Sequence, residues 1–196
     1  MAELAYADEK LFLWLNGFVG TIPALDRVAE WVASDYLVPI AMALSLIALW
    51  FIEPVQKIRE RHQIGVFVAL TSMAVSSLVV FIINGLYFRP RPFETLDATL
   101  LFYRPTDSSF PSNAVAAMFG IAFGVLAVHR RLGAILVGVA SVYALSRVYA
   151  GVHYPSDVVV AAAIGIPVTY AVVKGRDLLT PILTRVIRAA RILCLA

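Results

Sequence analysis

Five long apolar stretches divide the chain, and short polar or basic segments separate them. The stretches are Tyr36–Ile52, Ile64–Ile83, Asn113–Val128, Leu132–Leu145 and Val158–Val173. A helix that crosses the hydrocarbon core of a bilayer needs about 20 mostly apolar residues. The third and fourth stretches are short for this purpose, so we expect their helices to extend into the flanking polar segments. The pattern predicts an all-α fold, a polytopic transmembrane bundle of five spanning helices.

A segment of mixed character precedes the five spans. Over Lys10–Ala33 large apolar side chains are interleaved with polar ones, and the segment is interrupted near Gly20–Pro23. This mixture is typical of an amphipathic helix lying at the membrane interface; a sixth, poorly apolar span is the alternative. After Gly175, arginines at three-residue spacing predict a second surface helix, with Arg185, Arg188 and Arg191 along it. We find no repeat or linker, so residues 1–196 are expected to form a single membrane domain.

The composition agrees with a membrane protein. Hydrophobic residues make up 61% of the chain and charged residues 15%, whereas soluble domains are usually about 45–50% apolar and about 25% charged. The net charge of +3 informs loop orientation, and we expect no nucleic-acid partner. Cys194 is the single cysteine, which excludes an intrachain disulfide and a cysteine-based zinc site. The acidic N-terminal residues argue against a cleaved signal peptide.

Basic residues orient the predicted spans. The segment Glu53–Gln63, the turn His129–Arg131 and the C-terminal segment are all basic, and the alternation of five spans places them on one side, which the positive-inside rule assigns to the cytoplasm. The segments Asn84–Phe110 and Ser146–Asp157 then share the opposite side. The first of these also contains arginines, against the charge rule, so a functional reason for them is needed.

Three polar segments meet on that opposite side, and together they suit phosphate. They are "NGLYFRPRPFE" (84–94), "SSFPSNA" (108–114) and "SRVYAGVHYPSD" (146–157). Arg91 and Arg147 offer planar, permanently charged forks that match phosphate oxygens. Ser112 and Asn113 open a helix, where free backbone N–H groups bind anions; a helix cap without ligand is the alternative. Asp107 and Glu94 are interpreted as solvated loop residues.

A histidine lies next to this phosphate cradle. His153 comes just before Pro155, which can begin a helix, and Asp157 then falls in the first turn. A carboxylate there is expected to reach an imidazole nitrogen, fix the tautomer and stabilise the imidazolium. The set suits covalent phosphoryl transfer through a phosphohistidine. We expect no metal and no other cofactor, because arginines stand where a metal enzyme would need carboxylates.

These motifs resemble those of the type-2 phosphatidic-acid phosphatase superfamily. The third motif of that superfamily is matched at Ser146, Arg147, His153 and Asp157. The pair Pro111-Ser112 resembles the start of the second motif, and Arg91-Pro92 the end of the first. "YFRPRPF", "SSFPSN" and "HYPSDV" look most similar to undecaprenyl-pyrophosphate phosphatases of the bacitracin-resistance type. Those small bacterial enzymes recycle the lipid carrier of peptidoglycan synthesis, which implies a multi-pass protein of the bacterial cytoplasmic membrane with an extracytoplasmic active site.

The resemblance also implies residue roles. His153 would be the nucleophile and Asp157 its orienting carboxylate, with Arg147 in the catalytic set. The residues expected to hold substrate phosphate are Arg91, Ser112, Asn113, Asn84, Arg89 and Ser146. The first motif usually begins with lysine, where this chain has Asn84; Arg89 is a candidate to compensate. The second motif usually has a histidine, the expected general acid, where this chain has Ala114. Loss of a general acid costs typically about 10²–10⁴-fold in rate.

The missing acid bears on the substrate. A pyrophosphate ester expels a phosphate monoester, whose second pKa is about 6, whereas phosphatidic acid expels a far more basic alkoxide. We therefore favour dephosphorylation of undecaprenyl pyrophosphate, a long-chain prenyl lipid that would enter laterally from the bilayer. A phosphatidylglycerol-phosphate or phosphatidic-acid phosphatase is one alternative, and a catalytically impaired protein that binds lipid phosphates is another. A homo-oligomer is left open. Vanadium haloperoxidases share a similar site, but they are soluble proteins, so the hydrophobic composition of this chain argues against that activity.

Overall fold

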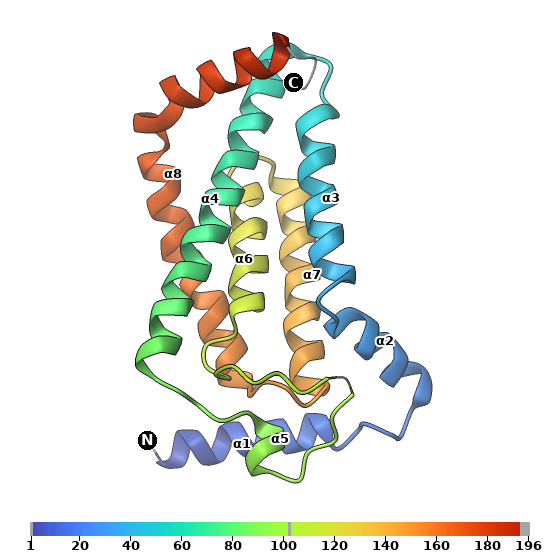
Figure 1. The fold of residues 1–196 in the computed structure, drawn as a ribbon. Helices are drawn as coiled ribbons and strands as arrows, with labels where there is room; N and C mark the ends of the chain where they lie inside the picture. The colour runs from blue at the N-terminus through green and yellow to red at the C-terminus, as the bar shows by residue number, and fades with distance from the viewer. Residues whose placement is uncertain (1, 102, 193–196) are drawn as a thin grey trace.

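The computed structural model describes residues 2–101 and 103–192, and within these ranges all regular structure is helical (Figure 1). The helices are α1 (Ala2–Asn16), α2 (Pro23–Ala33), α3 (Leu37–Phe51), α4 (Gln56–Leu86), α5 (Pro92–Thr95), α6 (Asn113–Leu126), α7 (Arg130–Tyr149) and α8 (Pro155–Ile192). Cys194 and the side chains of Arg188 and Arg191 lie outside what the structure describes. The predicted all-α membrane bundle is confirmed.

Each predicted span coincides with a helix of the bundle. Helices α4 and α7 and the Pro155–Arg176 part of α8 are long and apolar enough to cross a membrane. Helices α2 and α3 pass the same test only as a pair, bent by 52° at their junction. Helix α6 is apolar but has 14 residues. Helices therefore lie where the spans were predicted, while the number of five spanning helices stays a prediction.

Two helix boundaries differ from the sequence prediction. Helix α4 begins at Gln56 rather than Ile64, because the basic segment before the apolar stretch continues as helix. Helix α8 runs without interruption from Pro155 to Ile192. The separate surface helix predicted after Gly175 is therefore a continuation of α8, whose last part turns across the end of the bundle in Figure 1. Straight-chain and basic residues sustain a helix beyond its apolar portion.

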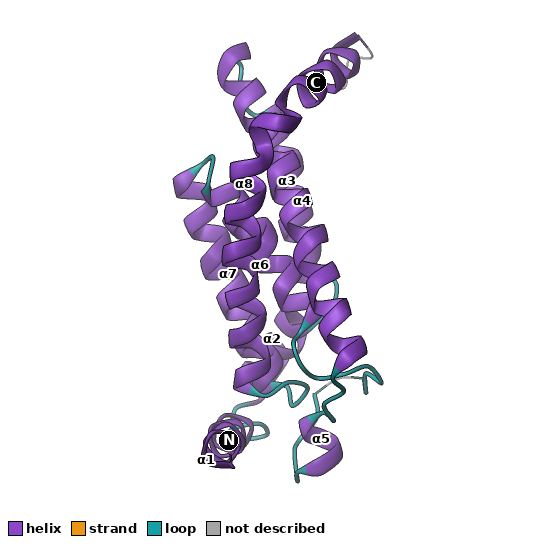
Figure 2. Cartoon of the chain, turned by 90° about the vertical axis from the view of Figure 1, so that its left-hand side faces the viewer, coloured by secondary structure: helices purple, strands orange, loops and turns teal. Residues whose placement is uncertain are grey.

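The N-terminal region is divided near the predicted break. Helix α1 ends at Asn16 and α2 begins at Pro23, a residue well suited to the first helical position. Helix α1 begins at Ala2, earlier than the predicted Lys10, and lies across one end of the bundle; Figure 2 views it end-on. Helix α2 instead leads into α3. The interfacial helix and the sixth span both stay predictions for this region.

Helix α6 lies at the centre of the bundle and packs against α4, α7 and α8. Gly120 and Gly124 permit its close approach to α4: a Cβ atom on Gly124 would lie 2.4 Å from the Cα of Ala69, and one on Gly120 would lie 2.9 Å from the Cα of Met73. Small residues at such spacing are typical of tightly packed membrane helices. This packing places the start of α6 beside the start of α8.

The polar segments gather at opposite ends of the bundle. The connection between α4 and α6, the start of α6 and the turn between α7 and α8 all lie at the end where α1 and α5 are found (Figure 1). At the other end, Lys57, Arg61 and Arg176 line a cavity of about 440 Å³. The basic segments thus share one end, as the alternation of spans predicts. Which membrane face each end occupies stays a prediction.

Candidate active site

The turn between α7 and α8 presents His153. Gly151 has a φ of +90°, a left-handed conformation that favours glycine, and a Cβ atom there would lie 2.7 Å from the carbonyl oxygen of Thr99. The backbone N–H of Val152 bonds to the carbonyl of Arg147 at 3.2 Å, and Pro155 then begins α8. The turn leaves the His153 side chain only 2% exposed, between the long connection and the start of α6.

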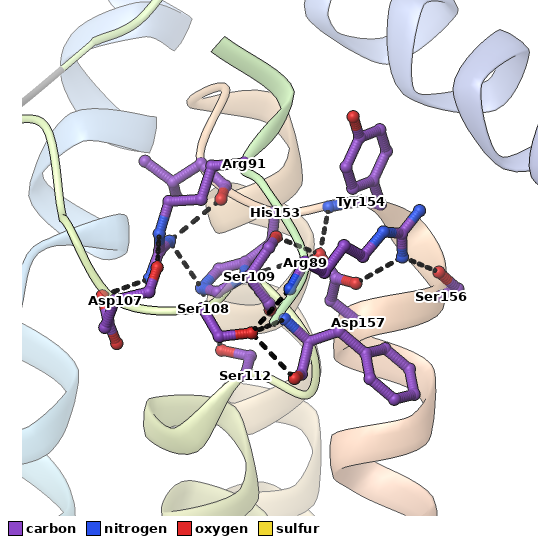
Figure 3. Close-up of polar contacts among 12 residues, drawn as sticks. Arg89, Arg91, Asp107, Ser108, Ser109, Ser112, His153, Tyr154, Ser156 and Asp157 are labelled. Atoms are coloured by element: carbon purple, nitrogen blue, oxygen red, sulfur yellow. Dashed lines mark hydrogen bonds and ion pairs between the residues drawn. The ribbon is translucent and has the colours of Figure 1, made fainter. Parts of the chain in front are cut away.

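The two ring nitrogens of His153 have different partners. Nδ1 lies 3.0 Å from the carbonyl oxygen of Ser109, which can only accept, so Nδ1 carries the proton in the neutral ring. Nε2 is then a lone-pair acceptor, 3.1 Å from the Oγ of Ser112 and 3.4 Å from Nη1 of Arg91 (Figure 3). Ser112 is the N-cap residue of α6, yet its hydroxyl makes no capping hydrogen bond. The ring nitrogen that carries the lone pair is therefore Nε2, and it faces hydrogen-bond donors.

Asp157 does not form the direct hydrogen bond to the imidazole that the sequence suggests. Its Oδ2 lies 3.7 Å from Nδ1 of His153, within ion-pair range but too far for a hydrogen bond. Oδ2 instead accepts from the Oγ of Ser109 at 2.5 Å and from the backbone N–H of Tyr154 at 2.8 Å. The physical reason is local, since the free amides at the start of α8 attract the carboxylate. Asp157 thus acts on His153 through Ser109 and through its charge.

Arg91 and Arg147 are both buried and both oriented by oxygen atoms. Arg91 donates to the carbonyl of Val152 at 3.0 Å, to the carbonyl of Asp107 at 3.1 Å and to Oδ1 of Asp107 at 2.7 Å. Arg147 donates from Nη1 to Oδ1 of Asp35 and to the hydroxyl of Tyr143, each at 2.8 Å. Asp107 is 66% exposed, but it is not only a solvated loop residue. These hydrogen bonds hold both guanidinium groups in defined orientations.

A cavity of about 240 Å³ lies between these groups. Its lining residues are Asp35, Arg91, Tyr103, Pro105, Asp107, Ser112, Asn113, Ala114, Ala117, Arg147 and His153. The structure therefore brings together six of the positions singled out in the sequence: both cradle arginines, the histidine, and the run 112–114 at the start of α6. The first backbone amides of α6 add to the anion-binding character of this cavity.

Three predicted substrate-binding residues do not line the cavity. Ser146 donates its hydroxyl to the carbonyl of Tyr143 at 2.7 Å, within its own helix, a common alternative for serine. Asn84 lies in α4, with its Oδ1 buried and without a hydrogen-bond partner. Arg89 points away from the cavity, toward Asp8, Asp157 and Ser156. Figure 3 shows Arg91 and Asp107 on one side of His153 and Arg89 and Ser156 on the other.

The sequence reasoning missed four residues that line the cavity, of which two, Asp35 and Tyr103, have polar side chains; the other two are Pro105 and Ala117. The carboxylate of Asp35 accepts hydrogen bonds from Arg147 and from the hydroxyl of Tyr103. Burial alone would raise the pKa of Asp35, but the hydrogen bonds from Tyr103 and Arg147 outweigh it and lower the pKa below 3.8. Asp35 is thus ionised at neutral pH. Its position at the junction of two predicted helices was a weak signal, because junctions often hold acidic residues.

Burial lowers the pKa of His153 to about 4, and the positive charges of Arg147 and Arg91 act in the same direction, against the opposing effect of Asp157. The imidazole is therefore neutral at pH 7. In the unfolded chain it would protonate below a pH of about 6.5. The free energy of unfolding is consequently expected to fall as the pH drops from about 6.5 toward 4.

We predict that His153 stays a neutral, Nδ1-protonated imidazole down to a pH of about 4–5. With three histidines in the chain, ¹⁵N NMR of histidine-labelled protein in micelles can follow each ring, and the His153→Gln variant identifies the resonance. The ¹⁵N shifts report the tautomer as well as the titration. A His153 resonance that titrates near pH 6.5, or an Nε2-protonated ring, would contradict the geometry described above.

Comparison with known proteins assigns the family. The PAP2 superfamily model matches residues 65–180, more than half of the chain. Undecaprenyl-diphosphatase BcrC of Bacillus subtilis (strain 168) is 27% identical over 179 residues, covering 91% of this chain and 89% of its own. The crystal structure of LpxE from Aquifex aeolicus is similar with a TM-score of 0.61 and 28% identity, over 84% of this chain and 93% of the other.

A second solved structure has the same fold. It is the transmembrane PAP2-type phosphatidylglycerolphosphate phosphatase of Bacillus subtilis, with a TM-score of 0.65 and 20% identity, over 90% of this chain and 87% of the other. Together with the apolar helices, these relatives show a multi-pass membrane protein. The family resemblance found in the motifs is confirmed: the chain belongs to the PAP2 superfamily of lipid phosphatases.

Proposed function

We propose that this protein removes the terminal phosphate of undecaprenyl pyrophosphate, giving undecaprenyl phosphate through a phosphohistidine. One observation carries the proposal: the unprotonated Nε2 of His153 faces an arginine-lined cavity in which Ala114 occupies the place of the expected general acid. The relative BcrC, named as an undecaprenyl-diphosphatase, supports the same substrate class.

The chemistry follows from the groups that line the cavity. The terminal phosphate would bind between Arg91 and Arg147, whose fixed charges neutralise its oxygens. Nε2 of His153 attacks phosphorus, a nitrogen–phosphorus bond forms, and the bond to the bridging oxygen breaks. The bridging oxygen leaves with its electron pair as part of undecaprenyl phosphate. The ring becomes cationic, and its Nδ1–H bond to Ser109 and the charge of Asp157, 3.7 Å away, stabilise it.

A second displacement restores the enzyme. Water attacks the phosphorus of the phosphohistidine, the nitrogen–phosphorus bond breaks, and Nε2 regains its lone pair. The proton of the water is taken up by the inorganic phosphate that leaves. The hydroxyl of Ser112, 3.1 Å from Nε2 in the free protein, must turn toward phosphate when the nitrogen–phosphorus bond forms. Ser112 can therefore donate to the nucleophile in one state and to the phosphoryl group in the other.

The leaving group distinguishes the candidate substrates. Undecaprenyl phosphate leaves as a weak base, whereas the alkoxides of phosphatidic acid and phosphatidylglycerol phosphate need protonation. In the cavity, Ala114 offers only a methyl group, and Asp35 is ionised. The solved phosphatidylglycerolphosphate phosphatase shares the fold at 20% identity, which does not choose between substrates. The absence of an acid at Ala114 favours a phosphoanhydride.

A depression at the bend between α2 and α3 is a candidate site for the lipid chain. A second depression, of about 430 Å³, is lined by Trp31, Leu37 and Ile40 among others, at the bend between α2 and α3. Asp35, which lines the phosphate cavity, lies within the same bend. We propose that the prenyl chain enters laterally here while the diphosphate occupies the cavity. In the proposed orientation this end of the bundle faces the extracytoplasmic side of a bacterial cytoplasmic membrane.

The proposal is tested by substrate preference in the presence of a chelator. We expect phosphate release from undecaprenyl pyrophosphate at least about 100-fold faster than from phosphatidic acid or phosphatidylglycerol phosphate, the low end of what general acid catalysis contributes. The measurement is release of inorganic phosphate in mixed micelles at equal surface concentration of each lipid, with EDTA present throughout. Equal rates on all three lipids would contradict the substrate assignment, and loss of activity with EDTA would contradict the metal-independent mechanism.

A further inference from the structure

Helix α1 is fixed to the site end of the bundle by three side chains at every fourth position, Asp8, Phe12 and Asn16. Phe12 is fully buried, and its ring centroid lies 5.6 Å from that of Tyr154. Asn16 is 4% exposed and donates to the carbonyls of Thr99 and Tyr149, each at 2.8 Å. Residues at this spacing share one face of a helix. Helix α1 is therefore held by specific contacts along that face.

Asp8 joins α1 to the start of α8. Its side chain is 9% exposed. Oδ1 accepts from the backbone N–H of Ser156 at 2.8 Å, and Oδ2 accepts from the hydroxyl of Ser156 at 2.5 Å. The first amides of a helix lack partners within the helix, and a carboxylate is stabilised near them. Asp8 thus caps α8 from a distant part of the chain.

Arg89 connects Asp8 to Asp157. Its Nη2 donates to Oδ2 of Asp8 at 2.9 Å, and its Nη1 donates to Oδ1 of Asp157 at 2.6 Å. The guanidinium also lies over the ring of Tyr154, 3.9 Å from its centroid. Burial would lower the pKa of Arg89, but Asp157 and Asp8 outweigh it and raise the pKa. Arg89 is thus a cation held between two carboxylates.

The chain of contacts continues from Asp157 to the nucleophile. Oδ2 of Asp157 accepts from the hydroxyl of Ser109 at 2.5 Å, and the carbonyl of Ser109 accepts from Nδ1 of His153 at 3.0 Å. The backbone of Arg89 holds the same loop, since its carbonyl accepts from the N–H of Ser109 at 2.9 Å. A displacement of Arg89 would therefore displace Ser109, which fixes the tautomer and direction of the His153 ring.

We propose that Asp8 is a positioning residue of the phosphoryl-transfer site, acting through Arg89, Asp157 and Ser109 to keep Nε2 of His153 directed into the cavity. The inference rests on the proposed role of His153 as nucleophile. Asp8 does not line the cavity that holds His153, Arg91 and Arg147, so it is placed to act on the reacting phosphate only through other residues. Asp8 binds one side of the Arg89 guanidinium, so that Arg89 is held between Asp8 and Asp157. Asp8 also joins α1 to the start of α8, next to the site.

A double-mutant cycle between Asp8 and Arg89 tests the proposal. We expect Asp8→Asn to lower kcat on undecaprenyl pyrophosphate about tenfold, as for outer-shell partners that orient metal-binding histidines, with KM changed less than about twofold because the cavity is untouched. In the Arg89→Gln background the same substitution should add less than about twofold. Glu3→Gln, an exposed carboxylate of the same helix, is the matched control and should leave kcat unchanged.

Orthovanadate provides a readout that does not depend on turnover. It imitates the five-coordinate phosphorus of the transition state, and such analogues bind tightly only when the nucleophile is well placed. We expect calorimetry to show binding that His153→Ala abolishes and Asp8→Asn weakens about tenfold. Wild-type protein that binds vanadate in this manner but hydrolyses no prenyl pyrophosphate would overturn the proposed substrate and keep the inference.

Three outcomes would overturn the inference itself. The first is a wild-type kcat and vanadate affinity in Asp8→Asn. The second is that Asp8→Asn lowers kcat by the same factor in the wild-type protein and in the Arg89→Gln variant. Asp8 would then act independently of Arg89, for example by holding α1 on the bundle. The third is a wild-type protein with neither turnover nor vanadate binding, because His153 would then have no nucleophilic role for Asp8 to support.

Discussion

Replacing His153 by alanine is expected to abolish phosphate release from undecaprenyl pyrophosphate, with a fall in kcat of at least about 10³-fold; removal of a nucleophile in a hydrolase costs up to about 10⁶-fold. The reason is that, in the proposed mechanism, Nε2 of His153 forms the covalent bond to phosphorus; it lies 3.1 Å from the Oγ of Ser112 and 3.4 Å from Nη1 of Arg91. Release of inorganic phosphate in micelles, with wild type alongside, measures the effect.

The covalent intermediate gives this prediction its sharpest form. With substrate labelled in the terminal phosphate, rapid quenching in alkali should trap label on the wild-type protein and none on His153→Ala. His62→Gln is the matched control, because His62 lies in the first part of α4, beside His129 at the other end of the bundle. The His62→Gln protein should be labelled like wild type. Retained hydrolysis in His153→Ala, or equal labelling of wild type and His153→Ala, would show that His153 is not the nucleophile.

The helices could be predicted from the sequence because their signal is local. An apolar stretch such as Asn113–Val128 carries its own evidence for a buried or spanning helix, and the structure places α6 there. The ends of helices were harder to predict where polar residues continue a helix, as in the part of α4 before Ile64. Helix α2 packs chiefly on α7 and helix α3 chiefly on α4, so the bend of 52° between them involves different neighbours and could not be predicted from a local stretch of sequence.

The site could be predicted only in part, because many of its contacts join residues that lie far apart in the sequence. Motif spacing identified His153 and Arg91, but contacts across long separations decide which atoms meet. Asp35 bonds to Arg147 across 112 positions, and Asp8 bonds to Ser156 across 148. No local pattern connects such residues, although the four-residue spacing of Asp8, Phe12 and Asn16 could have indicated one packed face of α1.

Matching a motif also did not fix the direction of a side chain. Ser146 belongs to the third motif by spacing, yet its hydroxyl is used within α7. Arg89 was a candidate to compensate for the charge missing at Asn84, but its guanidinium forms ion pairs with two carboxylates, Asp8 and Asp157, and points away from the cavity. A permanently charged side chain goes to the most favourable counter-charges within reach. The counter-charges of Arg89 become evident only once α1 is placed.

Introducing a histidine at position 114 should change substrate selectivity more than any other single substitution in the cavity. Ala114 lies in the first turn of α6 and lines the cavity with His153 and both cradle arginines. An imidazolium there can protonate a leaving alkoxide, so Ala114→His is expected to raise phosphatidic acid hydrolysis by about 10²–10⁴-fold. Hydrolysis of undecaprenyl pyrophosphate should change less than about tenfold, because its leaving phosphate, with a second pKa of about 6, needs little protonation.

The comparison requires kcat/KM for both lipids in wild type, Ala114→His and Ala117→His. The third protein is the matched control, since Ala117 lines the same cavity one turn further along α6. This variant adds the same imidazole away from the start of the helix, and it should not raise phosphatidic acid hydrolysis.

An equal gain in phosphatidic acid hydrolysis from both substitutions would mean that the added positive charge, rather than an acid at position 114, accounts for the gain. If both lipids gain equally in Ala114→His, the wild-type protein lacks an acid that its own substrate needs, and the phosphoanhydride assignment fails. A gain confined to phosphatidic acid would show that the leaving group is what allows this site to work with an alanine at position 114.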